Sequence, residues 1–306
     1  MSALQWRDWS CTVRVVLDDG RSAEAPPALA LARRAERIVG ELMDDVARSA
    51  SRFRGDSDLS RINAARGRLV PVRPRTIELV ELALQAARQT GGACDPTLGR
   101  ALVAAGYDAD IDHVRARVGR APQPSPGGDW TRVRVDRDLG RVGVPASLAL
   151  DLGATAKAWT ADEAAARIAR KLDIPALVAL GGDVAVSDRG PVWPVLVSEV
   201  EGGPGEVVGL GRGGIATSST TGRAWMTATG PAHHLIDPES GGPVSGPYRA
   251  VSVLAESCLA ANTLSTAGLV WGAAALDRLS PYAARLVDTG GGIVTTRTWP
   301  RDRVAA

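Results

Sequence analysis

The chain has 306 residues, enough for one large domain or two smaller ones. Its net charge of +2, from 36 basic and 34 acidic side chains, excludes the strongly basic surface of a protein that binds a polyanion. Hydrophobic residues make up 45% of the sequence, which excludes a largely disordered chain and is enough for a sizeable core.

Cysteine usage and the N-terminal sequence favour a cytoplasmic protein. Cys11, Cys94 and Cys258 are odd in number and widely spaced, so neither a disulfide framework nor a metal-finger pattern is expected. The N-terminus lacks the apolar stretch of a signal peptide, and no such stretch precedes Cys11. Because no run of about 18 apolar residues occurs, we expect no membrane insertion. We also expect no nucleic-acid partner.

In the first half of the chain, the spacing of apolar residues predicts one strand and then two long helices. In chain order these are a strand at 11–17, a helix at 27–50 and a helix at 75–89. Residues 51–63 break the helical pattern, and the Ser-Asp-Leu-Ser sequence at 57–60 indicates a helix start. The glycine pair at 91–92 ends the second helix, and residues 94–97 are then a loop or a new helix start.

The second half begins with a Pro- and Gly-rich segment, 119–129, which indicates a surface loop or a joint between two subdomains of a single domain spanning 1–306. Residues 214–244 are rich in turn formers. The remaining pattern first predicts strands at 131–135 and 140–143, followed by a segment at 146–172 that contains a strand, a glycine turn and a helix. It then predicts strands at 176–180, 192–197, 206–210 and 249–255. A helix at 258–280 and two short strands complete the chain. This order is neither strictly βαβ nor all-β, so an α+β fold is predicted.

A turn that enters a helix is the first candidate for chemistry. Asp151 ends a predicted buried strand, Gly153 allows the turn, and Lys157 falls in the first turn of the helix. The N-terminus of a helix offers free N–H groups and a positive dipole, which suit a phosphate group. Lys157 is one of only two lysines, Lys171 being the other. The alternative is an ordinary helix-entry turn with a solvated lysine.

Three further patterns are candidates. The turn Gly181-Gly182-Asp183 follows an apolar strand and suits a close approach of the backbone, although hairpins use the same residues. His233 and His234 point to opposite faces if they lie on a strand, so one could be buried and active while the other is exposed. The alternative is a structural histidine that bonds to the following turn. Two polar residues four apart on the last helix, Asn262 and Thr266, share a face and could hold a hard cation or form a plain polar patch.

Taken together and in order, seven segments resemble the ApbE family. They are SDLSRIN (57–63), GGACDPTLG (91–99), DLGATAKAWTAD (151–162), ALGGDV (179–184), IATSSTTGR (215–223), HLIDPESGGPV (234–244) and AANTLSTA (260–267). Members of that family are Mg²⁺-dependent FAD:protein FMN transferases, which attach FMN to a threonine of a target protein. The resemblance runs from about residue 35 to 275. It implies an α+β fold with FAD in a cleft between two subdomains, and a flavin-acceptor protein as partner.

The resemblance also implies site residues. Contacts with FAD are implied for Ala93, Cys94, Asp95, Asp151, Lys157 and Ile236. Mg²⁺ ligands are implied for the backbone carbonyl of Ala154 and for the side chains of Asn262, Ser265 and Thr266. His234 matches the family's histidine, which would take the proton of the acceptor hydroxyl or hold a phosphate oxygen.

This sequence departs from the family pattern at the metal. Asn262 stands where the family normally has Asp, and Ser265 stands where a second acid often lies. Neutral oxygens in place of carboxylates predict a Mg²⁺ affinity lower by more than about tenfold, at ~1.4 kcal/mol per decade. Cys94 replaces a Phe, which favours a small hydrophobe in the wall of the site. Ser219 replaces the glycine of the family's TSG turn.

Two alternatives to the transferase stay open on this basis. One is a catalytically weakened relative that binds FAD as a carrier or sensor. The other is a pyrophosphatase that hydrolyses FAD to FMN and AMP in the same site.

Overall fold

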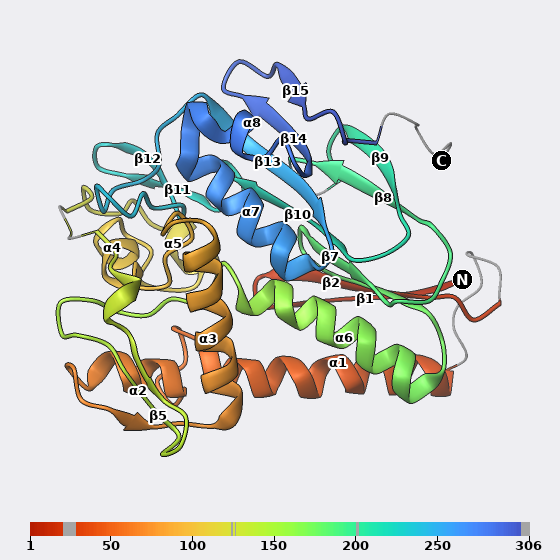
Figure 1. The fold of residues 1–306 in the computed structure, drawn as a ribbon, viewed down its shortest axis with the longest axis horizontal. Helices are drawn as coiled ribbons and strands as arrows, with labels where there is room; N and C mark the ends of the chain where they lie inside the picture. Colours follow the sequence, from red (N-terminus) through yellow and green to blue (C-terminus); the bar gives the residue numbers. More distant parts are fainter. Residues whose placement is uncertain (21–28, 124, 126, 200–201, 301–306) are drawn as a thin grey trace.

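An eight-stranded antiparallel sheet forms the centre of the computed structural model, which describes residues 1–20, 29–123, 125, 127–199 and 202–300. Its strand order is β1-β2-β6-β7-β10-β13-β14-β15 (Figure 1). The strands are β1 (Ser2–Asp8), β2 (Cys11–Leu17), β6 (Ala176–Leu180), β7 (Asp183–Val186), β10 (Gly214–Ser219), β13 (Tyr248–Ala255), β14 (Ala283–Asp288) and β15 (Ile293–Thr295). Neighbours in this order are all antiparallel.

Three helices cover one face of this sheet (Figure 1). α6 (Ala156–Leu172) packs on β6 and β7, α7 (Cys258–Trp271) packs on β10 and β13, and α1 (Leu29–Ala50) packs on α6. The predicted helices are therefore confirmed within the described residues; positions 27–28 of the first lie outside them. The last helix is shorter than predicted, because Gly272 ends it with a φ of 56°, and η2 (Gly272–Ala274) and α8 (Ala275–Arg278) follow.

The β-hairpin of β8 (Trp193–Ser198) and β9 (Gly205–Leu210) packs on the opposite face, and both strands were predicted. The alternation of side chains along β6 shows the two sides of the sheet. Val178 packs in the cluster with the helices, whereas Leu177 packs with Trp193 and Val195 of the hairpin. The sheet is thus buried on both faces over these strands.

A smaller unit lies beside the sheet, at the end of α1 (Figure 1). It contains α2 (Asp58–Ala64), β3 (Val70–Pro71), α3 (Pro74–Gln89), α4 (Gly99–Ala104), α5 (Ile111–Arg115), η1 (Trp130–Arg132), β4 (Arg134–Asp136) and β5 (Arg141–Gly143). A later hairpin, β11 (Ala224–Thr227) with β12 (Gly230–His233), returns to pack on it. Tyr107, Trp225 and Ile236 share the small apolar core that results. The position of a joint at 119–129 stays a prediction.

Several strand predictions were wrong. Residues 146–150 form no strand and make only the single bridge Leu98–Ala149. Residues 130–132 are a 3₁₀-helix, so β4 begins only at Arg134. The turn-rich segment 214–244 contains β10, β11 and β12, and β1 was not predicted. The α+β class is confirmed.

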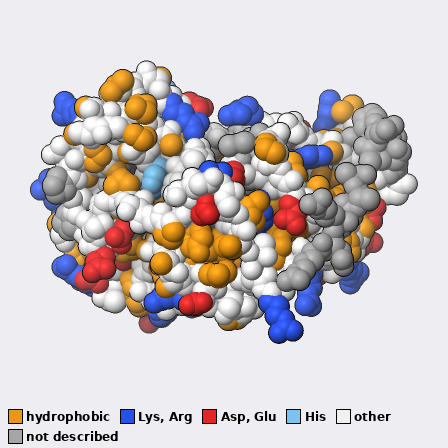
Figure 2. Space-filling model, turned by 90° about the horizontal axis from the view of Figure 1, so that it is seen from above, with side chains coloured by type: hydrophobic (Ala, Val, Ile, Leu, Met, Phe, Trp, Pro, Cys, Tyr) orange, Lys and Arg blue, Asp and Glu red, His pale blue; other side chains and the backbone are white. Residues whose placement is uncertain are grey.

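Charges and apolar stretches complete the description of the whole chain. In the view of Figure 2, basic and acidic side chains are interspersed, in agreement with the small net charge.

Among the described residues, one helical stretch, Cys258–Arg278, has the length and composition to cross a membrane. Its mean hydropathy is 1.3, and half of its most apolar part is buried inside the protein. The packing of α7 on two strands of the sheet and on α6 is sufficient reason for its apolar sequence.

Candidate active site

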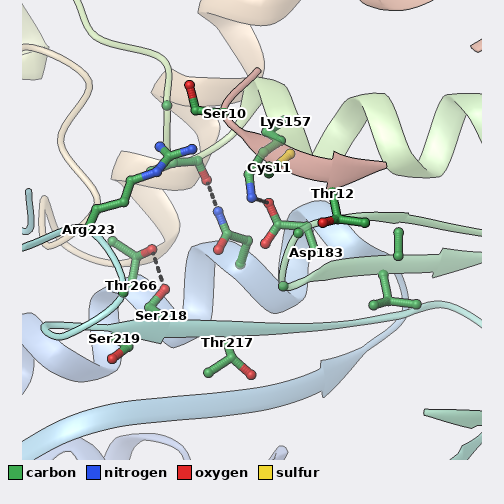
Figure 3. A pocket seen from close by; sticks show the side chains of 18 of the residues that line it. Ser10, Cys11, Thr12, Lys157, Asp183, Thr217, Ser218, Ser219, Arg223 and Thr266 are labelled. Carbon is green, nitrogen blue, oxygen red and sulfur yellow. Dashed lines mark hydrogen bonds and ion pairs between the residues drawn. The ribbon is translucent and has the colours of Figure 1, made fainter. Parts of the chain in front are cut away.

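A cavity of about 740 Å³ lies where the large sheet meets the smaller unit, and Figure 3 shows part of it. It brings together nearly all the site residues implied by the resemblance: Ala93, Cys94, Asp95, Asp151, Ala154, Lys157, His234, Ile236, Asn262 and Thr266. Ser265 does not line the cavity, because it is fully buried behind Ser218. Residues far apart in the sequence therefore meet at one place.

Asp151 is held at the cavity wall by its neighbours. Asn63 of α2 bonds both backbone groups of Leu150: its Nδ2 donates to the carbonyl at 2.9 Å, and its Oδ1 accepts from the N–H at 2.7 Å. The Asp151 carboxylate accepts from Gly153 N at 2.8 Å and pairs with Arg52 Nε at 2.7 Å. Its charge is thus balanced before any ligand binds.

Lys157 extends from the first turn of α6 toward the turn between β6 and β7. Its Nζ lies 2.8 Å from Asp183 Oδ2 and donates to the carbonyl of Leu180 at 2.9 Å (Figure 3). Gly181 in that turn has a φ of 62°, a conformation that favours glycine, and the turn aims Asp183 at the ammonium. An ammonium group has three N–H donors, so one stays available for a ligand in the cavity.

An aromatic cluster that the sequence did not single out forms one wall. The Arg52 guanidinium lies over the Phe53 ring at 4.4 Å and the Tyr107 ring at 4.8 Å. Tyr107 meets Phe53 edge-on and stacks on Trp225, with ring centroids 5.6 and 5.4 Å apart. Phe53 is 47% exposed, so a flat ring system has room to pack there. The available signal was that Phe53 is the only phenylalanine of the chain.

The segment 93–97 is fixed by its own hydrogen bonds. Asp95 Oδ1 accepts from Thr97 N and Oγ1 at 2.7 and 2.6 Å, and its Oδ2 accepts from Trp130 N at 3.2 Å. Burial raises the pKa of the Asp95 carboxyl. Burial also raises the pKa of the Cys94 thiol to about 12, so Cys94 fills the wall as a neutral, small apolar group.

The two adjacent histidines have different roles. His233 Nε2 bonds the carbonyl of Val244 at 3.1 Å and so ties the following turn. His234 lines the cavity, and its buried Nδ1 has no partner among the described residues. Burial, together with the nearby Arg223 guanidinium, lowers the pKa of His234 to about 3. Its imidazole is therefore neutral near pH 7.

The positions expected to hold Mg²⁺ form a hydrogen-bonded cluster instead of an open set of ligands. Asn262 Nδ2 donates to the carbonyl of Ala154 at 2.6 Å. Ser218 Oγ lies 3.0 Å from Thr266 Oγ1 (Figure 3) and 2.9 Å from Ser265 Oγ. In the described ranges, no three His, Cys, Asp or Glu side chains lie close enough together to hold a metal. Without a carboxylate, this set does not fit a hard divalent cation.

Arg223 is a further residue that sequence reasoning missed, although it ends the quoted segment 215–223. Its side chain extends into the cavity, between Ser10 and Thr266 as seen in Figure 3. In the part of the chain that the structure describes, no carboxylate lies within ion-pair distance of its guanidinium. By contrast, the charges of Lys157 and Arg52 are paired.

Comparisons with known proteins agree on one family. Residues 8–285 match the family model described as ApbE family. The curated FAD:protein FMN transferase of Vibrio cholerae is 25% identical over 265 residues, which cover 80% of this chain and 76% of that protein. The crystal structure of the ApbE protein of Thermotoga maritima superposes with a TM-score of 0.82 at 26% identity, covering 97% of both chains. That of the Pseudomonas stutzeri flavinyl transferase ApbE, in its apo form, gives 0.75 at 25% identity, covering 96% of this chain and 94% of that one.

Proposed function

The chain belongs to the ApbE family, and we propose from this and from the geometry of the cavity that it is an FAD:protein FMN transferase. It binds FAD and transfers FMN, through a phosphoester, to a threonine of an acceptor protein with release of AMP. The observation that carries the proposal is that the FAD-contacting positions implied by the resemblance line one cavity, among them Asp151, Lys157 and Ile236.

The charges and walls of the cavity support FAD as the ligand. Gly153, Ala154 and Lys157, at the start of α6, line the cavity, so the positive end of the helix dipole lies near it together with the Lys157 ammonium. These groups suit the diphosphate. The exposed ring of Phe53 beside Tyr107 suits the flat flavin. A cavity of about 740 Å³ falls in the size range of small-molecule sites.

The reaction requires positioning and charge neutralisation more than covalent help from the protein. The threonine oxygen forms a bond to the phosphorus of the FMN half, and the bond from that phosphorus to the AMP phosphate oxygen breaks. AMP leaves with the electron pair. His234 is proposed to take the proton of the attacking hydroxyl, or to hold a phosphate oxygen. Binding of the negatively charged diphosphate would offset Arg223 and make the imidazole more basic.

Mg²⁺ is the metal that the resemblance implies. The donor set on α7 and at Ala154 does not fit the ion in this chain, because Asn262 turns a hydrogen-bond donor toward the Ala154 carbonyl. No step of the proposed mechanism therefore passes through a metal held by the protein.

The test is to incubate the chain with FAD and a threonine-containing acceptor peptide, with a Thr→Val peptide as control. The transferase predicts that only the threonine peptide gains the mass of one FMN unit, together with AMP in solution. Free FMN and AMP without a labelled peptide would instead show hydrolysis. FAD that is bound but unchanged would show the carrier or sensor function. Either of these results would overturn the proposal.

A further inference from the structure

The disagreement between the metal expected at the site and the groups present points to a second inference. We propose that in this chain the Asn262–Ala154 hydrogen bond closes the metal position, and that the Arg223 guanidinium supplies the positive charge opposite the transferred phosphoryl group. The inference rests on the proposed function, since it concerns the same bound FAD.

The orientation of the Asn262 amide is the first argument. Its Nδ2 lies 2.6 Å from the Ala154 carbonyl oxygen, a short and favourable N–H···O contact. The reverse orientation would bring two oxygens to that distance, which is repulsive unless a cation lies between them. With nitrogen toward Ala154, the amide blocks the carbonyl that the resemblance assigns to the ion. An aspartate at position 262 could not donate in this way.

The hydroxyl oxygens of the cluster are already engaged in hydrogen bonds. Ser265 is fully buried and lies within hydrogen-bond distance of both Ser218 and the carbonyl of Asn262, at 2.9 and 3.2 Å. Thr266 bonds to the same Ser218. Coordination of an ion would break these contacts without gaining a carboxylate, so the energetic balance opposes it.

The carboxylates that line the cavity nearby are also occupied. Asp151 is paired with Arg52 and bonded to the N–H of Gly153. Asp183 is 2% exposed and paired with Lys157. Neither is free to neutralise a dication.

Arg223 then supplies the cavity with a cation whose charge is not already paired. Its side chain extends into the cavity, between Ser10 and Thr266 as seen in Figure 3, and no carboxylate of the described residues pairs with it. The backbone carbonyl of Arg223 accepts the N–H of His234 at 3.2 Å, which fixes the base next to the cation. A planar guanidinium binds two phosphate oxygens at once. When the threonine–phosphorus bond forms and AMP departs, this group would stabilise the charge on the equatorial oxygens.

The first test measures metal binding without turnover, by titration of Mn²⁺ followed by electron paramagnetic resonance. We expect the chain as it stands to show weak binding and Asn262→Asp to bind at least about tenfold more tightly. Equal binding by the two proteins would overturn the closed metal position.

The second test measures FAD affinity by flavin fluorescence in EDTA. Arg223→Gln should weaken binding by about 10- to 100-fold, the size of a lost charge-assisted hydrogen bond. Arg212→Gln removes the same charge from an exposed residue outside the cavity and should leave affinity unchanged. Unchanged FAD affinity in Arg223→Gln, or a drop to the same extent in both variants, would overturn the role of Arg223.

Both readouts are independent of transfer. If FAD and Mn²⁺ behave as expected while no flavin reaches a threonine, the inference on this site stands and the proposed function fails. If transfer occurs while Asn262→Asp binds Mn²⁺ no better, the function stands and the inference fails.

Discussion

Lys157 has a structural role as well as its proposed contact with FAD, and the two can be separated. Lys157→Ala should weaken FAD binding, more strongly at low salt, because a phosphate contact is screened by ions. It should also lower the free energy of unfolding by about 3 kcal/mol, because Asp183 would be left buried without a partner.

The double variant Lys157→Ala/Asp183→Asn is the control for that prediction. It removes the buried charge, so denaturant unfolding should show most of the stability restored while FAD affinity stays low. Recovery of both properties would contradict a direct contact between Lys157 and FAD.

His234 makes the stability of the fold depend on pH in a defined direction. Its folded-state pKa of about 3 lies below the ordinary value of 6.5, so the unfolded chain binds the proton first as the pH falls. The stability that this group contributes is present above pH 6.5 and is lost toward pH 3, by about 1.4 kcal/mol per pH unit. Asp162 has the opposite effect on the pH dependence of stability, because burial raises the pKa of its carboxyl to about 6. The stability that Asp162 contributes is fully present below pH 3.8 and is lost as the pH rises through 6.

A variant isolates the histidine from that opposing effect. Compared with the original chain, His234→Gln should become progressively more stable as the pH falls from 6.5 to 4 in denaturant titrations at each pH. His113→Gln, at an exposed position, should track the original chain. A constant difference across this pH range would show that the pKa of His234 is not lowered.

At the scale of elements, α2 holds the segment that carries Asp151 in place through the Asn63 side chain. Asn63→Ala would leave the N–H and carbonyl of fully buried Leu150 without their partners, so we expect unfolding to require about 2–4 kcal/mol less. Asn63→Asp keeps the acceptor but sets a carboxylate oxygen against the Leu150 carbonyl, so it should lose at least as much. FAD affinity should fall in the same order, measured by flavin fluorescence. Unchanged FAD affinity in Asn63→Ala would contradict the positioning of the Asp151 segment by Asn63.

The start of α7 depends on α6 in a similar way. Asp162 accepts from the N–H groups of Cys258 and Leu259 at 2.8 and 2.9 Å, and Ser257 caps the next N–H. Asp162→Ala should therefore lower the free energy of unfolding by about 2 kcal/mol. Glu163→Gln, the adjacent position in a solvent-accessible pair with Arg167, should change it by under about 1 kcal/mol. Equal effects in chemical unfolding would contradict the anchoring role.

Periodicity predicted the elements whose partners are apolar, and it missed those with polar partners. The helices at α1, α3 and α6 follow amphipathic patterns and were predicted within a few residues. β10 carries Thr217 and Ser218, which favour turns in isolation. In the fold their hydroxyls bond Ser252, Ser265 and Thr266 on the adjacent strand and helix. A single sequence does not show such long-range partners.

The opposite error, at residues 146–150, has a related cause. Leu148 and Leu150 alternate as in a strand, but the Asn63 side chain occupies both backbone groups of Leu150. Residues 146–147 form a turn, with Leu148 N bonded to the Pro145 carbonyl, so only the single bridge at Ala149 remains. Similarly, Asp183 was predicted only as part of a turn, because its pairing with Lys157 joins residues from two separate elements.

At the scale of the whole molecule, the cavity exists because the chain leaves the large sheet after α1 and returns to it through α6. Gly214 lets α7 approach β10 closely, since a Cβ there would collide with the backbone of Cys258. This packing brings the polar residues of α7 to the same cavity as the segment 151–157. The resemblance could place the site residues in the sequence; the hydrogen bonds that occupy Asn262, Ser265 and Thr266 emerged only from the folded arrangement.

The central claim is that this cavity transfers FMN from FAD to a threonine. The most direct measurement is the ratio of AMP released to flavin bound covalently to the acceptor, followed over time in one reaction. We expect one flavinyl-threonine for each AMP at every time point. AMP matched by free FMN, or no AMP from a chain that has bound FAD, would contradict it.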